Sequence, residues 1–97
     1  MSKLEKKQIV SKLSTLPSWQ LIFEDSMYKL QKVFNFDDFE KALKFTNKVG
    51  TLSEKHDHHP RIVLEWGRVN ITWWSHSEGG VVDSDFVMAE KVDKLKI

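Results

Sequence analysis

Residues 61–73 read RIVLEWGRVNITW, and their pattern is the strongest structural signal in the chain. On both sides of a central glycine, apolar side chains occupy every second position: Ile62, Leu64 and Trp66, then Val69, Ile71 and Trp73. This alternation is typical of half-buried strands, and Gly67-Arg68 is typical of a turn that joins two strands. We therefore predict a β-hairpin here, with Trp66 and Trp73 packed in the core.

A second hairpin is predicted nearer the N-terminus. Residues 19–24 alternate between apolar and polar side chains, and residues 24–26 have the composition of a turn. A further strand follows, with large side chains at Tyr28, Leu30, Phe34 and Phe36. The chain thus contains two predicted strand pairs.

Helices are predicted on both sides of these hairpins and between them. Residues 2–5, which read SKLE, have the spacing of a capping box and open a first helix. Asp37 and Glu40 mark the start of a second helix, which reaches about Lys55. Residues 83–95 carry the apolar spacing of a third helix.

The resulting order αββαββα predicts an α+β fold in a single domain spanning residues 1–97. Hairpins with separate helices favour a four-stranded antiparallel sheet with three helices on one face. The chain is 40% hydrophobic and 30% charged, which is typical of a folded domain and argues against disorder. A chain of this length has a small core, so we also expect it to self-associate.

The composition excludes several classes of protein. The chain has no cysteine, which excludes disulfides and thiolate zinc sites and suits a cytoplasmic location. The net charge of +1 provides no field that favours nucleic acid. No apolar run approaches the ~20 residues needed to cross a bilayer, and residues 1–7 are too charged for a secretory signal. We therefore expect no nucleic-acid partner and no membrane partner.

Histidines are concentrated in one part of the chain. All four fall within residues 56–76, and three of them lie in the run EKHDHHP at residues 54–60. Pro60 disfavours helical backbone at His59, so this segment should join the second helix to the third strand. Residues at such a junction can be held by both elements and remain open to a ligand.

Acid–base chemistry is one use for this cluster, because imidazole titrates near neutral pH. Glu54 and Asp57 are close enough in sequence to orient an imidazole. A solvated histidine-rich loop is the simplest alternative, and a zinc site is another. Adjacent side chains of an extended chain point in opposite directions, which disfavours His58 and His59 as ligands of one ion.

The fourth strand should carry two more residues of this region. Its alternation places Trp74 and His76 on the face opposite the core. Trp74 could stack on a flat heterocycle there, or it could pack in a subunit interface.

The spacing of these residues resembles that of the pterin-4a-carbinolamine dehydratase family. The shared pattern comprises Glu54, His58-His59-Pro60, Trp66, His76 and Asp85, and the resemblance extends from Leu16 through Phe36 to the last helix. The runs EWG at residues 65–67 and TWWSHS at residues 72–77 look most like bacterial members. His56 and Arg61 depart from the family pattern, but neither belongs to its histidine trio.

The resemblance implies a four-stranded antiparallel sheet with helices on one side. It implies dehydration of 4a-hydroxytetrahydropterin to quinonoid dihydropterin without a metal or cofactor, with His58, His59 and His76 as catalytic residues. From their places in the sequence and from the resemblance, we expect binding or orienting roles for Glu54, Asp57, Pro60, Trp74 and Asp85.

Homodimers or homotetramers are also implied, as is a link to aromatic amino acid hydroxylases, which use the recycled pterin. A non-catalytic pterin-binding or dimerisation module is the main alternative function, and a metal-dependent hydrolase is a second.

Overall fold

The computed structural model describes residues 2–96. Within this range lie three α-helices, one short 3₁₀-helix and four strands. The elements are α1 (Lys6–Leu13), β1 (Gln20–Glu24), β2 (Met27–Asn35), α2 (Phe39–His56), β3 (Arg61–Glu65), β4 (Arg68–Trp73), η1 (His76–Glu78) and α3 (Asp83–Asp93). The predicted α+β order is therefore confirmed. No helix in residues 2–96 is long and apolar enough to cross a membrane.

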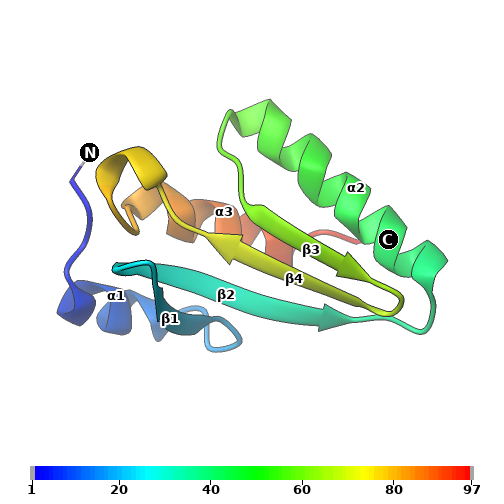
Figure 1. The fold of residues 1–97 in the computed structure, drawn as a ribbon, viewed down its shortest axis with the longest axis horizontal. Coiled ribbons are helices and arrows are strands. Elements are labelled where there is room, and N and C mark those ends of the chain that lie inside the picture. Colours follow the sequence, from blue (N-terminus) through cyan, green and yellow to red (C-terminus); the bar gives the residue numbers. More distant parts are fainter. Residues whose placement is uncertain (1, 97) are drawn as a thin grey trace.

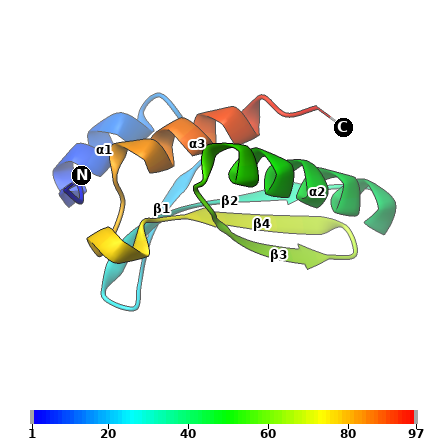
Figure 2. The same ribbon diagram turned by 90° about the horizontal axis from the view of Figure 1, so that it is seen from above.

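The strands form one antiparallel sheet in the order β1-β2-β4-β3, so β2 and β4 are central (Figure 1). Both predicted hairpins are present, and Leu30 pairs with Trp73 where β2 meets β4. In the first hairpin, Asp25 and Ser26 both have positive φ, which suits the twist of a two-residue turn. Figure 2 shows the three α-helices on one face of the sheet, while the other face carries no helix.

The core lies between the helices and the covered face of the sheet. Val69, Ile71 and Trp73 of β4 are fully buried, as their alternation predicts. They belong to one cluster with buried side chains from all three α-helices, namely Ile9, Ala42, Phe45, Val49, Phe86, Met88, Ala89 and Val92. Because β4 is central and packed against this cluster, the position where it ends is held firmly.

The predicted capping box at residues 2–5 is wrong. The first helix begins at Lys6, and the Glu5 N–H donates to the Gln8 side chain at 2.9 Å. The Leu4 N–H donates instead to the Val81 carbonyl at 2.7 Å. Leu4 is therefore bonded to the chain before α3, and this long-range hydrogen bond overrides the local helix signal.

Two other helix boundaries differ slightly from the prediction. The cap of α2 is Asp38, not Asp37, and its carboxylate accepts from the Lys41 N–H at 2.8 Å. The last helix ends at Asp93 instead of residue 95. Both changes lie within the fraying that is normal at helix ends.

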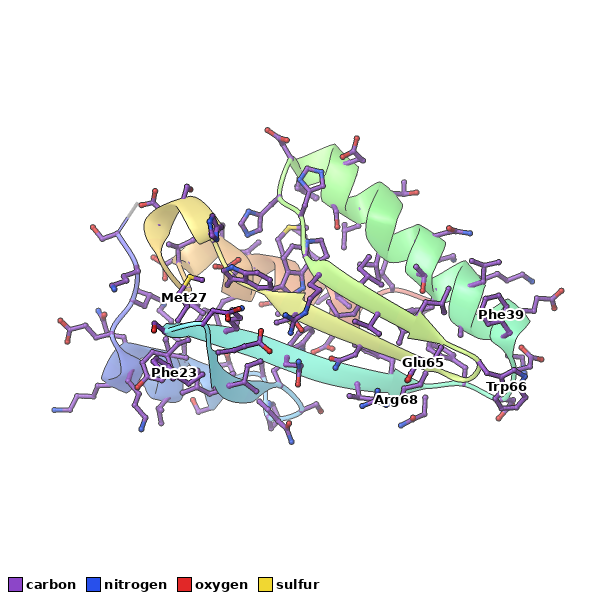
Figure 3. All side chains as sticks on the ribbon, in the orientation of Figure 1. Phe23, Met27, Phe39, Glu65, Trp66 and Arg68 are labelled. Atoms are coloured by element: carbon purple, nitrogen blue, oxygen red, sulfur yellow. The ribbon has the colours of Figure 1, made fainter. Side chains whose placement is uncertain are left out.

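Trp66 is not a core residue, which corrects the prediction. Its side chain is 69% exposed, and Figure 3 shows it at the tip of the β3–β4 hairpin. The turn falls at Trp66–Gly67, one residue earlier than expected, so Trp66 lies beyond the covered part of the sheet. A Cβ at Gly67 would lie 2.8 Å from the Phe36 carbonyl oxygen, which explains why glycine occupies this position.

Candidate functional site

The site begins where α2 ends. Asp57 adopts the left-handed conformation with φ of 48°, and its N–H donates to the carbonyls of Ser53 and Glu54. This cap turns the chain away from the helix axis, so that His58 and His59 leave the helix before β3 begins at Arg61. Pro60 follows His59 in this connection and is half-buried.

His58 is directed toward the interior. A hydrogen bond of 2.5 Å joins its Nε2 to Asp85 Oδ1, and its imidazole stacks on the Trp73 ring with centroids 5.4 Å apart. The His58 side chain is only 21% exposed. The ring is therefore held on one face by an indole and at one nitrogen by a carboxyl group.

Asp85 is the buried anchor of this arrangement. Its side chain is 0% exposed, and its Oδ2 accepts from the Val82 N–H at 2.9 Å and from the Ser75 hydroxyl at 3.1 Å. Burial raises the pKa of the Asp85 carboxyl above its ordinary value of 3.8, although these hydrogen bonds and that from His58 act in the opposite direction. One carboxyl group thus connects α3 with the ends of α2 and β4.

His59 is directed toward solvent. Its Nε2 is hydrogen-bonded to Glu54 of the last turn of α2, and the two side chains are 54% and 79% exposed. Adjacent side chains in an extended segment diverge, so one histidine faces the interior and the next faces water. In both histidines Nε2 is engaged by a carboxyl group, which leaves Nδ1 available to a ligand.

His76 lies after β4, not within it, which corrects its expected position. The strand ends at Trp73, and His76 is the first residue of η1. An isolated bridge between Ser75 and Gly80 closes the turn that carries His76. Within residues 2–96, the His76 side chain has no carboxylate hydrogen-bonded to it.

These segments meet around one cavity of about 310 Å³, lined by His58, His59, Trp74, Ser75, His76 and Ser77. The structure thus brings the three predicted catalytic histidines and Trp74 together. Asp85 is the hydrogen-bond partner of His58, and Glu54 is that of His59. Ser75 and Ser77 were not among the predicted site residues, and their signal in the sequence is their position on either side of His76.

Two other residues of the histidine segment do not line the cavity. Asp57 is the exposed cap of α2, and His56 is the exposed last residue of that helix. The described residues include no group of three or more histidine, cysteine or carboxylate side chains arranged to hold a metal ion. Three imidazoles line the cavity, and two of them are hydrogen-bonded to carboxyl groups. Positioned imidazoles of this kind are suited to proton exchange with a ligand.

Comparison with known proteins adds to this geometry. The family model described as pterin 4 alpha carbinolamine dehydratase matches residues 2–95. A relative from Chlorobium limicola, named "Putative pterin-4-alpha-carbinolamine dehydratase", is 50% identical over 82% of this chain and 71% of its own length. A relative of the same name from Chlorobaculum tepidum is 45% identical over 92% of this chain and 80% of its own length.

Two solved structures are also similar. A structure described as transcriptional coactivator/pterin dehydratase from Brucella melitensis has a TM-score of 0.84 at 33% identity, covering 95% of this chain and 96% of that one. A pterin dehydratase-like protein, identified as a RuBisCO assembly factor in the alpha-carboxysome, has a TM-score of 0.65 at 27% identity. That match covers 78% of this chain and 86% of the other.

Proposed function

Because the chain belongs to the pterin 4 alpha carbinolamine dehydratase family, we propose that it removes water from a 4a-hydroxytetrahydropterin and releases the quinonoid dihydropterin. The observation that carries this proposal is the cavity of about 310 Å³ that His58, His59 and His76 line together. A pterin is a flat, polar heterocycle, and the same cavity offers it an indole wall, two hydroxyls and three imidazoles.

The reaction requires two proton movements. The C4a–O bond breaks, and the hydroxyl leaves as water once it has accepted a proton. The N5–H bond gives up its proton, and its electron pair forms the N5=C4a double bond. One positioned donor and one positioned acceptor meet this requirement, and such groups typically contribute ~10²–10⁴-fold each.

The environments of the histidines support a division of roles. His59 and His76 are exposed to the cavity and to solvent, so both can exchange protons with substrate and water. His58 is largely buried between Trp73 and Asp85, which suits it to orient the substrate through Nδ1. We therefore assign proton transfer to His59 and His76, and a binding or orienting role to His58.

Steady-state kinetics on single variants test this proposal. His59→Ala and His76→Ala should each lower kcat/KM by ~10²-fold or more, because each removes a positioned acid–base group. His58→Ala should have an intermediate effect. The control is His56→Ala, which changes an exposed histidine outside the cavity and should retain most activity. A silent His76→Ala together with a damaging His56→Ala would overturn the assignment.

Metal independence belongs to the same proposal. Exhaustive chelation should leave the dehydration rate unchanged, and a loss that zinc restores would contradict this chemistry.

A non-catalytic role is the alternative function. The similarity to the RuBisCO assembly factor supports it, because that protein is pterin dehydratase-like and takes part in assembly. A stopped-flow assay of carbinolamine decay distinguishes the two functions. A decay rate that the protein does not change would favour the binding or assembly role.

The wider setting of the activity is also part of the proposal. We place the protein in the cytoplasm as a homodimer or homotetramer that returns pterin cofactor to an aromatic amino acid hydroxylase. The uncovered sheet face and the small core support self-association. Light scattering that shows only monomer at micromolar concentration would remove that part of the proposal.

A further inference from the structure

Lys29 is a charged side chain that is only 1% exposed. Its neighbour Leu30 points into the core, so Lys29 points to the opposite face of the sheet, which no helix covers. Lys29 precedes Leu30, which pairs with Trp73, so the register of β2 and β4 brings Lys29 opposite Trp74. The Lys29 Nζ lies 3.9 Å from the centroid of the Trp74 ring. This is a cation–π contact, and its removal from water strengthens the attraction.

The ammonium group of Lys29 is fixed from the other side by two carboxylates. Its Nζ lies 2.9 Å from Glu24 Oε1 and 3.5 Å from Asp25 Oδ2. Glu24 also accepts from Arg61 at 2.7 Å, and the two cations hold the pKa of the Glu24 carboxyl at about 2. The guanidinium carbon of Arg61 lies 5.4 Å from the Trp74 ring. One carboxylate therefore holds two cations beside the same indole.

Lys29 and Arg61 both lie against the Trp74 ring. Its Nε1 is buried and has no hydrogen-bond partner among residues 2–96, so no hydrogen bond fixes the indole. Trp74 also lines the histidine cavity, whereas Lys29 does not. Whatever fixes the orientation of this ring also fixes the shape of the cavity wall.

We propose that Lys29 is a positioning residue, which holds the Trp74 indole in place as a wall of the histidine cavity and thereby sets the affinity for a flat pterin. The inference rests on the proposed function of that cavity. Lys29 acts only through Trp74, so its loss should weaken substrate binding and leave the proton-transfer groups in place.

The chain supplies a matched control on the same strand. The Lys32 Nζ lies 4.7 Å from the Phe34 ring and 2.7 Å from Asp93 Oδ1. Asp93 also accepts from Trp19 Nε1 at 3.0 Å. Lys32→Met therefore removes an ion pair and a cation–π contact of the same kind, but on the helix-covered face and away from the cavity.

The first measurement is steady-state kinetics. Lys29→Met should raise KM by about fivefold or more while kcat changes by less than about twofold, because a desolvated cation–π contact is lost and the histidines are untouched. Lys29→Arg keeps a cation and should restore most of the affinity. Glu24→Gln loosens the hold on Lys29 and should raise KM in the same direction. Lys32→Met should leave KM unchanged.

The second measurement does not depend on activity. The chain has four tryptophans, and the indole N–H signal of Trp74 can be assigned in ¹H–¹⁵N spectra from its loss in Trp74→Phe. Lys29→Met should shift or broaden this signal, whereas Lys32→Met should shift the signal of Trp19. Binding of 7,8-dihydropterin, measured by titration, should weaken in Lys29→Met and stay unchanged in Lys32→Met.

An unchanged Trp74 signal in Lys29→Met, or equal increases of KM in both methionine variants, would overturn the proposal. A wild-type protein without dehydratase activity would instead refute the proposed function. In that case the indole spectra and the dihydropterin titration still decide whether Lys29 positions Trp74.

Discussion

His58 and His59 are neighbours in the sequence, yet they lie in two different environments. The first is stacked on a buried indole and bonded to a carboxyl group that has no exposure, whereas the second pairs with a carboxylate in water. Breaking a buried pair lowers the free energy of unfolding strongly, because it leaves desolvated groups without partners. Breaking an exposed pair has little effect on stability, because water and salt screen the interaction. We therefore expect the buried His58–Asp85 pair to contribute mainly to stability and the exposed His59–Glu54 pair to contribute mainly to catalysis.

Replacing Asp85 with alanine should have the largest effect on stability. The change removes the acceptor of the Val82 N–H and the Ser75 hydroxyl and releases His58, so the free energy of unfolding should fall by about 2–4 kcal/mol. Chemical denaturation measures this loss. Asp83→Ala is the control on the same helix, because its exposed carboxylate pairs with the exposed Lys12, and it should cost less than about 1 kcal/mol. Equal losses in the two variants would abolish the distinction between buried and exposed pairs.

The pH dependence of stability is a second test of the buried His58–Asp85 pair, and its expected effect is smaller than that of Asp85→Ala. Burial raises the pKa of Asp85 in the folded protein, so the folded state binds this proton more tightly than the unfolded state. This stabilisation is fully present below the ordinary pKa of 3.8 and is lost as the pH rises through the higher pKa of the folded protein. Each unit of difference between the two pKa values corresponds to about 1.4 kcal/mol. The stability of the wild type relative to Asp85→Asn should therefore decrease as the pH rises from about 4 toward neutrality. Denaturation curves at several pH values measure it, and an increase over that range would contradict the assigned direction.

The smallest effect on stability is expected for Glu54→Gln. Its partner His59 is exposed, so the free energy of unfolding should change by less than about 0.5 kcal/mol. The kcat/KM should fall by only about two- to tenfold, because glutamine can still accept a hydrogen bond from the imidazole. Denaturation and kinetics on the same sample test both expectations. A destabilisation as large as that of Asp85→Ala would show that the exposed pair is structural after all.

Local alternation was sufficient to predict the sheet. In β4, Val69, Ile71 and Trp73 are all buried, because alternate side chains of this central strand face the helix-covered side of the sheet. The same rule failed at Trp66, since alternation alone does not reveal where the helices stop covering a hairpin. It also could not reveal that Leu4 bonds to Val81, a contact between distant parts of the chain.

The site was predictable to the extent that its residues are close in sequence or follow the family pattern. His58 and His59 lie within one junction that Pro60 marks, whereas Asp85 entered the prediction only through the resemblance. Nothing in the sequence around Asp85 indicates that it bonds to His58, because the two residues are 27 positions apart and no periodic signal links them. Lys29 was not identified at all, since a lysine in an alternating strand is ordinarily a solvated side chain until the strand order places it beside Trp74.

The bond from the Val82 N–H to Asp85 has a consequence for the lifetime of the site. This backbone amide can exchange its hydrogen with solvent only when it parts from the buried carboxyl group at the start of α3. The same opening would expose Asp85 and free His58 from its anchor. The hydrogen-exchange rate of the Val82 amide can be compared with the rates of the β4 core amides. The comparison measures how often the His58–Asp85 contact opens while the sheet stays folded.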